Sequence, residues 1–349
     1  MHLVLREIFN FRLMGKDLGI DLGTTNTLIY RKGRGVVLNE PSVLAIYKKD
    51  GRIMGVGRQA KQMLGKTPQN ILAIRPLRDG VIADFEITRK MLESFLEKIQ
   101  PQRTMIGPRL VIGVPSRATK VEKRALVDIA MEIGARKVFL VAEPVAAVIG
   151  ADLPISEPTG HMIVDIGGGT SEAAITSLDG VVISNSIRIA GDEMDEAIIQ
   201  YLKEKHNLFI GEQMAERIKI TLGYSSSKEE KKMKVRGRDL NTGFPSEIEL
   251  NSAEMREILD PVLTAILDMV EATLEQCPPE IAGDIMEKGI NLTGGGACLK
   301  GIDTYIAERV KLPVRVVPEP LLSVVLGLGK LLDDHHLLSA VEITPNTRE

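Results

Sequence analysis

The sequence has little of the chemistry on which disulfide frameworks and transition-metal sites depend. Its 349 residues include two cysteines, Cys277 and Cys298, five histidines and no tryptophan. The two cysteines show no disulfide or metal-binding spacing, which fits a reducing compartment. The histidines are scattered except for His335 and His336, and adjacent residues on a helix point in different directions. We therefore expect no metal site built on histidine or cysteine.

A long apolar run is also missing. The best run, residues 321–328, is interrupted by Ser323 and Gly327, whereas a membrane-spanning helix needs about 20 apolar residues. The N-terminal segment lacks the uninterrupted apolar core of a secretory signal because Arg6 and Glu7 break it. The sequence therefore predicts a cytoplasmic protein.

Positive charge is not in excess either. The chain carries 44 basic and 47 acidic residues, a net charge of −3 at pH 7. No overall positive field attracts nucleic acid, and we expect no nucleic-acid partner. The apolar fraction of 44% is that of an ordinary folded chain. At about 150 residues per domain, the length predicts two domains, or one large domain with insertions.

From residue 17 onward, short β-rich runs alternate with helical patterns. The clearest helix spans about 119–133, where Thr119 and Glu122 form a capping box and Gly134 ends the apolar periodicity. Strands interleaved with helices predict the α/β class. The expected strands are 18–22, 27–30, 43–47, 109–114, 137–141, 162–166, 172–176, 181–187, 289–293 and 314–317.

Two segments about half a chain apart share one pattern. GIDLGTTNTLI at 19–29 and IVDIGGGTSEA at 163–173 each place an aspartate near the end of an apolar strand, before a Gly/Thr turn and a second strand. This repeat predicts a duplicated domain with a hairpin loop in each half, although Asp-x-Gly turns also occur in ordinary hairpins. Between about 206 and 250 the chain is charged, which predicts a small subdomain with an exposed hairpin face.

The two Gly/Thr turns suit phosphate binding. Backbone N–H groups of a glycine-rich turn can approach phosphate oxygens closely, and hydroxyls add donors. The predicted contacts are Gly23, Thr24, Thr25 and Asn26 in the first loop, and Gly167, Gly168, Gly169 and Thr170 in the second. Asp21 and Asp165, at the strand ends, are placed to hold a hydrated Mg²⁺, which keeps several waters and takes few protein ligands.

A third glycine-rich turn follows the strand at 289–293. Gly294, Gly295, Gly296 and Ala297 either offer flat backbone to a purine ring or form a plain strand-to-helix turn. Two other glycine patterns are set aside. Residues 60–67 nearly match a phosphate-binding P-loop but lack its first glycine and its buried strand. Residues 55–60 lack the βαβ setting of a dinucleotide turn.

The phosphate loops, the Thr-Gly-Gly-Gly-Ala turn and AEPVAAVIGAD at 142–152 together resemble the actin-like ATPase superfamily. Five further segments are similar to its bacterial rod-shape-determining family. They are NEPSVLAI (39–46), IRPLRDGVIADF (74–85), IGVPS (112–116), TGHMIVDIGGGTSE (159–172) and NLTGGGACLKGID (291–303). The resemblance covers about residues 17–334. It implies an α/β, actin-like ATPase fold, in which two duplicated domains flank a nucleotide cleft and each carries a smaller inserted subdomain.

The resemblance also implies domain limits and cofactors. An amphipathic membrane-binding segment at 1–16 precedes a first actin-like domain at 17–157, whose small subdomain spans about 45–77. A second domain follows at 158–326, with a small subdomain at about 194–257. A C-terminal helix and tail at 327–349 return to the first domain. ATP or ADP with Mg²⁺ is the expected cofactor.

The resemblance assigns a role to Glu143 on the connecting helix. In this superfamily a polar residue at that position orients the attacking water, so Glu143 is expected to act as general base in slow ATP hydrolysis, with Thr170 helping to place the water. A carboxylate at a helix start also complements the helix dipole, which is the alternative role of Glu143. By similarity, Gly191 and Asp192 are expected to meet the ribose and Lys219 to flank the base.

Two segments are candidates for membrane attachment. Within residues 1–16, apolar side chains recur at helical spacing among basic ones, namely Leu5, Ile8, Phe9 and Leu13. Such a helix could lie in an anionic leaflet, or the terminus could dock on the core. Met105 and Ile106 align by resemblance with an apolar membrane-inserting loop of the family, although they could equally form a packed turn.

Together with these features, the resemblance implies an ATP-dependent, filament-forming cytoskeletal protein at the inner face of a bacterial cytoplasmic membrane. By resemblance, copies of the chain polymerise, membrane proteins of cell-wall elongation are partners, and the filament maintains cell shape. Two alternatives share the phosphate loops. A heat-shock chaperone would need a substrate-binding domain, for which the residues after 334 are too few. A sugar or acetate kinase would need a base above a substrate pocket.

Overall fold

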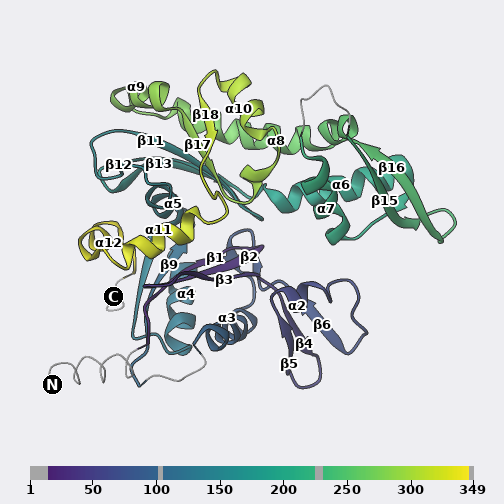
Figure 1. The fold of residues 1–349 in the computed structure, drawn as a ribbon, viewed down its shortest axis with the longest axis horizontal. Coiled ribbons are helices and arrows are strands. Elements are labelled where there is room, and N and C mark those ends of the chain that lie inside the picture. Colours follow the sequence, from purple (N-terminus) through teal and green to yellow (C-terminus); the bar gives the residue numbers. More distant parts are fainter. Residues whose placement is uncertain (1–14, 101–104, 225–230, 346–349) are drawn as a thin grey trace. The chain divides into compact units, whose positions relative to one another are not determined.

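The computed structural model describes residues 15–100, 105–224 and 231–345, and Figure 1 shows the order of its elements along the chain. The chain divides into two compact units. The first unit contains the residues up to 157, residues 177–180 and the residues from 322 onward, and the second contains 158–176 and 181–321. The domain limits expected from the sequence stay predictions.

A five-stranded sheet with the order β10-β9-β1-β2-β3 is the centre of the first unit. β1, β2 and β3 are joined as antiparallel neighbours, whereas β9 runs parallel to both β1 and β10. The strands are β1 (Leu18–Leu22), β2 (Asn26–Arg31), β3 (Gly35–Pro41), β9 (Arg109–Val114) and β10 (Lys137–Ala142).

Two helices cover one face of this sheet. α3 (Phe85–Ile99) and α4 (Lys120–Glu132) contribute to an apolar core together with β1. Because side chains alternate along a strand, Leu18 and Ile20 point into this core while Gly19 points to the opposite face.

The opposite face is covered by α5 (Glu143–Gly150) and α11 (Ser323–Leu331). These two helices cross with their backbones in contact. A Cβ added to Gly327 would lie 1.8 Å from the Ala146 carbonyl oxygen, and one added to Gly150 would lie 1.8 Å from the Ser323 carbonyl oxygen. Only glycine fits at both positions, so the crossing holds α5 firmly against α11.

Smaller elements complete the first unit. A three-stranded sheet with the order β5-β4-β6 packs on the short helix α2, and β7 pairs with β8 in a small hairpin. The last helix, α12, follows α11. These elements are β4 (Leu44–Tyr47), β5 (Ile53–Val56), α2 (Arg58–Lys61), β6 (Ile71–Ile74), β7 (Leu77–Arg78), β8 (Val81–Ile82) and α12 (His335–Val341).

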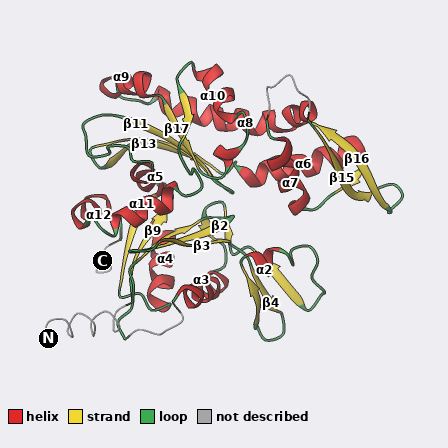
Figure 2. Ribbon diagram, in the orientation of Figure 1, coloured by secondary structure: helices red, strands yellow, loops and turns green. Residues whose placement is uncertain are grey.

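The second unit repeats the sheet plan with the strand order β13-β12-β11-β17-β18. β11 pairs antiparallel with β12 and parallel with β17. Figure 2 shows these strands in yellow and the helices of the unit in red. The strands are β11 (His161–Ile166), β12 (Ser171–Ser177), β13 (Gly180–Ile187), β17 (Ile290–Thr293) and β18 (Val314–Val316).

The rest of the second unit contains helices and a charged hairpin. The helices are α6 (Gly191–His206), α7 (Glu212–Leu222), α8 (Ser252–Glu275), α9 (Pro279–Lys288), the 3₁₀ turn η1 (Gly296–Cys298) and α10 (Ile302–Val310). A separate sheet contains β14 (Leu208–Phe209), β15 (Lys232–Asp239) and β16 (Pro245–Asn251). Ion pairs such as Lys232–Glu249 and Arg236–Glu247 cross β15 and β16.

Most local expectations are confirmed. Each expected strand is present to within about two residues. The helix expected at 119–133 is α4, where Thr119 Oγ1 accepts from the Glu122 N–H and Glu122 Oε2 accepts from the Thr119 N–H. The charged segment does form an exposed hairpin. The single helix expected from 327 is instead two helices, because Asp334 caps a new helix by accepting from the Leu337 N–H.

Candidate functional site

The first predicted phosphate loop is the tight turn between β1 and β2. The Gly23 N–H donates to the Asn26 carbonyl oxygen over 3.1 Å, and a Cβ at Gly23 would lie 2.9 Å from that oxygen. Glycine is therefore required there. Ser42 supports the turn from the end of β3 by donating to the Gly23 carbonyl oxygen over 2.7 Å.

The two threonines of this loop have different roles. Thr24 is buried, and its Oγ1 accepts from the Gly80 N–H, in the turn between β7 and β8, over 3.0 Å. Thr25 Oγ1 is buried and has no hydrogen-bond partner among the described residues. A buried hydroxyl without a partner costs about 1–3 kcal/mol. The unsatisfied hydroxyl of Thr25 is consistent with its predicted role in the phosphate loop.

Glu143 is the first residue of α5 and lines a cavity of about 30 Å³. Because a water needs about 10–15 Å³ by this measure, the cavity has room for roughly two waters. Its other walls are mostly apolar and come from β7, β8, the end of β9 and α4. Gly80 also lines it, so the turn that Thr24 holds is one wall of the cavity beside Glu143.

The second loop, between β11 and β12, has the same turn geometry as the first. The Gly167 N–H donates to the Thr170 carbonyl oxygen over 2.9 Å, and a Cβ at Gly167 would lie 3.0 Å from that oxygen. Its supports differ. The Gly191 and Asp192 N–H groups at the start of α6 donate to the Gly167 and Gly168 carbonyl oxygens over 3.2 and 2.7 Å. The predicted ribose residues thus lie directly beside the predicted phosphate loop.

Asp165 lies at the end of β11, opposite Glu172 of β12. Burial, and then the negative charge of Glu172, raise the pKa of Asp165 to about 7. A cation beside this carboxylate would lower its pKa again. In the first unit, Asp21 Oδ1 would lie 3.9 Å from a Cβ at Gly23, so that carboxylate lies close to its own loop. Within the described ranges, no group of three or more His, Cys, Asp or Glu side chains could hold a metal directly.

The third glycine-rich turn packs on the end of β11. Gly294 has φ +83°, and its Cβ would lie 2.2 Å from Asp165 Oδ1 and 2.4 Å from the Ile166 carbonyl oxygen. A Cβ at Gly296 would lie 2.2 Å from Ile166 Cγ2. These close approaches explain why residues 294 and 296 are glycine, whereas a Cβ at Gly295 would have more room. The structure therefore brings Gly294 and Gly296 to the second loop, with Ala297 buried behind them.

Lys219 reaches the same region from α7. Its Nζ donates to the Gly191 carbonyl oxygen over 2.7 Å and lies 2.9 Å from Asp195 Oδ1. Burial raises the pKa of Asp195 to about 6, against the lowering effect of Lys219. Lys219 therefore secures the start of α6, a role that the sequence did not suggest. The Gly-Asp-x-x-Asp spacing of 191–195 was the available signal for Asp195.

The candidate membrane loop lies beside the start of the described chain. Met105 is 85% exposed and Ile106 is 45% exposed. The Ile106 carbonyl oxygen accepts from the Gly15 N–H over 2.7 Å, so residue 15 emerges next to this loop. Leu5, Ile8, Phe9 and Leu13 lie outside the described residues.

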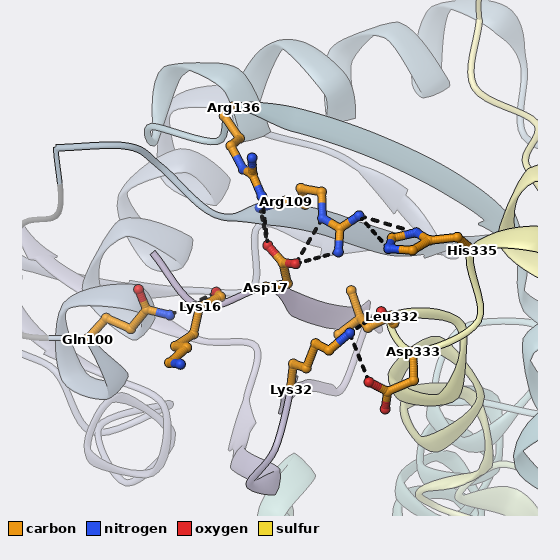
Figure 3. A network of polar contacts seen from close by, with 9 residues as sticks. All are labelled: Lys16, Asp17, Lys32, Gln100, Arg109, Arg136, Leu332, Asp333 and His335. Carbon is orange, nitrogen blue, oxygen red and sulfur yellow. Dashed lines mark hydrogen bonds and ion pairs between the residues drawn. The ribbon is translucent and has the colours of Figure 1, made fainter. Parts of the chain in front are cut away.

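A polar network surrounds the residues that follow Gly15, and its centre is Asp17 (Figure 3). Asp17 Oδ2 accepts from Arg109 Nε and Nη2 over 2.8 and 2.6 Å, and Arg136 lies 3.5 Å from Asp17 Oδ1. Burial alone would raise the pKa of Asp17, but its hydrogen bonds to Arg109 and the positive charges of Arg109 and Arg136 hold it below 3.8. Gln100 Nε2 donates to the Lys16 carbonyl oxygen over 3.1 Å.

Comparison with known proteins assigns a family to these features. Residues 15–340 match the family model described as MreB/Mbl protein. The chain is 51% identical over 327 residues to the cell shape-determining protein MreB of Escherichia coli, covering 92% of this chain and 94% of that protein. It is 44% identical over 324 residues to the cell shape-determining protein Mbl of Bacillus subtilis, covering 92% and 97%.

Solved structures agree with the sequence relatives. The crystal structure of MreB 5 of Spiroplasma citri bound to AMPPNP has a TM-score of 0.87 at 37% identity, covering 90% of this chain and 95% of that one. A MamK double helical filament has a TM-score of 0.77 at 25% identity, covering 91% and 98%. No helix among the described residues has the length and apolar character to span a membrane. The chain has the actin-like fold and belongs to the MreB/Mbl family.

Proposed function

We propose that this chain is an ATP-binding, filament-forming actin homologue that organises cell-wall synthesis and maintains cell shape. The observation that carries the proposal is the repeated hairpin loop, with the same glycine turn at Gly23 and Gly167 and a carboxylate beside each turn. The names of the relatives support the role in cell shape, and the MreB 5 structures bound to AMPPNP and to ADP support nucleotide binding. The kinase alternative gains no support from these comparisons.

The loops would bind phosphate oxygens chiefly through backbone N–H groups. Thr25 adds a buried hydroxyl that has no partner among the described residues, and Thr170 adds a second hydroxyl. Gly191 and Asp192 would meet the ribose, and the turn at 294–297 would lie against the base. Lys219 would act here mainly by holding the carbonyl of Gly191 in place.

Asp21 and Asp165 are the carboxylates proposed to hold a hydrated Mg²⁺. Carboxylate oxygens are the donors that this ion prefers, and the raised pKa of Asp165 is that of a buried carboxylate without enough positive charge nearby. A bound Mg²⁺ would neutralise negative charge on the phosphates of ATP.

Glu143 is the proposed general base for slow ATP hydrolysis. It lines a cavity with room for roughly two waters, and Thr170 would help to place the attacking water. We expect Glu143→Gln to lower the hydrolysis rate by about 10²–10⁴-fold, while ATP binding and ATP-dependent pelleting persist. Phosphate release and sedimentation, measured on the same samples, test this. Soluble monomers that phosphorylate a sugar would contradict the proposal.

Filaments would lie on the inner face of the cytoplasmic membrane, where membrane proteins of cell-wall elongation would be their partners. The bond between Gly15 and Ile106 supports this placement, because it brings Gly15, the first described residue, beside the loop that carries the exposed Met105. Two weak anchors at one site bind more strongly than either alone. We expect deletion of residues 1–14 combined with Met105→Ser and Ile106→Ser to abolish co-flotation with liposomes, and each change alone to weaken it. Unchanged flotation of the combined variant would refute this assignment.

A further inference from the structure

The C-terminal chain closes an edge of the first unit's sheet. β10 is the terminal strand in the order β10-β9-β1-β2-β3. After α12, the chain runs along the outer side of β10, where Glu342 forms an antiparallel bridge with Val141 and the Ile343 N–H donates to the Leu140 carbonyl oxygen over 2.8 Å. We name residues 342–345 the strap.

The strap pairs with β10 through one side chain as well as its backbone. The Leu140 N–H donates to Thr344 Oγ1 over 2.9 Å. The next residue is Pro345, which has no N–H and cannot extend the pairing. The threonine hydroxyl therefore takes the place of a backbone acceptor, which makes the contact sensitive to the residue at 344.

The strap is held firmly relative to the sheet. Ile343 packs against the apolar core of the first unit. The preceding helix α12 buries Leu338 and Val341, and the His335 ring bonds to Nη1 of Arg109 on β9 over 3.1 Å. A strand edge that would otherwise be open is thus paired by a segment with its own anchors.

The paired part of β10 lies immediately before Glu143. Leu140 and Val141 are followed by Ala142, which is the N-cap of α5 and makes no side-chain capping bond. The position of Glu143 therefore depends on the glycine crossing that holds α5 against α11 and on the pairing of the end of β10, whose inner side pairs with β9 as far as Ala142. On its outer side, the strap supplies that pairing.

We propose that the strap is a positioning element for Glu143. The inference rests on the proposed role of Glu143 as general base. A free outer edge would let the end of β10 move, and misplacement of a catalytic group by about 1 Å can cost about 10²-fold in rate. The predicted nucleotide contacts lie in other segments, so the strap should influence hydrolysis much more than binding.

The test compares kcat and KM for ATP in variants of the strap. We expect Thr344→Val, which keeps the shape but removes the acceptor, to lower kcat by about 10-fold with KM changed less than about twofold. Deletion of residues 342–349 should lower kcat at least as much. Thr344→Ser should restore wild-type kcat, and the amide of Leu140 should exchange with solvent faster in Thr344→Val than in Thr344→Ser.

Matched controls separate positioning from loss of folding or assembly. Glu342 is exposed and pairs through its backbone, so Glu342→Gln should behave as wild type. The pelleted fraction, measured in parallel, should stay constant. Unchanged kcat in both Thr344→Val and the deletion variant would overturn the inference, as would a kcat loss matched by an equal rise in KM. If Glu143→Gln also hydrolyses ATP normally, the proposed base fails, whereas normal hydrolysis in the strap variants alone overturns only the role of the strap.

Discussion

The two hairpin loops have nearly the same turn but are supported by different chemistry. Gly23 and Gly167 each donate to the carbonyl oxygen three residues later, over 3.1 and 2.9 Å. The first loop is held by side-chain hydroxyls, those of Thr24 and Ser42. The second is held by the start of α6 and by the close approach of Gly294.

This difference shows which part of the repeated unit is restricted by geometry. The turn itself favours glycine because its carbonyl acceptor would lie only 2.9 Å from a Cβ at Gly23 and 3.0 Å from one at Gly167. The surroundings need only satisfy the buried polar groups of each loop, and hydroxyls or backbone groups can both do so. The two loops should therefore respond differently to substitutions that remove hydroxyls and to substitutions that add a Cβ.

The largest effect is expected at Gly294 beside the second loop. Its φ of +83° and the 2.2 Å approach to Asp165 Oδ1 mean that Gly294→Ala combines backbone strain with overpacking. We expect the free energy of unfolding to fall by about 2–5 kcal/mol, measured by denaturant unfolding. The neighbouring Gly295→Ala is the control, since its Cβ would meet Leu321 at 3.3 Å. Equal losses in both variants would show that close packing does not distinguish this loop.

A smaller effect is expected at Thr24 beside the first loop. Thr24→Val leaves the partly buried Gly80 N–H without its acceptor, which should cost about 1 kcal/mol of unfolding free energy. Thr24→Ser keeps the hydroxyl and should remain close to the wild-type value. Hydrogen exchange at the Gly80 amide gives a local reading of the same bond. If the valine variant were as stable as the serine variant, hydroxyl support of the first loop would be refuted.

The smallest expected effect is on the pH dependence of stability, where one aspartate of each unit, Asp195 and Asp17, should act in opposite directions. Burial raises the folded-state pKa of Asp195 to about 6. Its contribution to stability is therefore fully present below the unfolded value of 3.8 and is lost as pH rises through about 6. Asp17 behaves in the opposite way, because its pKa is held below 3.8, and its contribution is lost only as pH falls through that lowered value.

Melting temperatures of wild type, Asp195→Asn and Asp17→Asn between pH 3 and 7 would test this contrast. The wild-type advantage over Asp195→Asn should shrink between about pH 4 and pH 6. The advantage over Asp17→Asn should stay constant in that range and shrink only below about pH 4. Parallel pH profiles for the two variants would contradict the assignment of opposite shifts.

Much of the fold was predictable because its signals are local. The strand periods, the Thr119 capping box and both Gly/Thr turns lie within a few residues of one another, and the structure confirms them. The family could be recognised from its motifs. The separate helices α11 and α12 were not expected, although Asp333 and Asp334 interrupt the apolar pattern and Asp334 caps the second helix.

The candidate site residues were chosen from the sequence and stay predictions, whereas the contacts that support them in the structure were not foreseen. The partners of Thr24 and Lys219 lie 56 and 28 residues away along the chain, and Thr344 reaches Leu140 across 204 residues. Pattern and spacing carry no information about such pairs.

By itself, the sequence determined the duplicated hairpins, the α/β class and the family, because each depends on local periodicity and on glycine where no Cβ fits. Tertiary structure alone decided three contacts. Thr24 Oγ1 accepts from the Gly80 N–H, Gly294 packs against Asp165, and the C-terminal strap pairs with the outer edge of β10, the strand that leads to Glu143. The physical reason is that buried polar groups must find partners among whatever residues folding brings near them. Those neighbours exist only once the sheets and helices have packed.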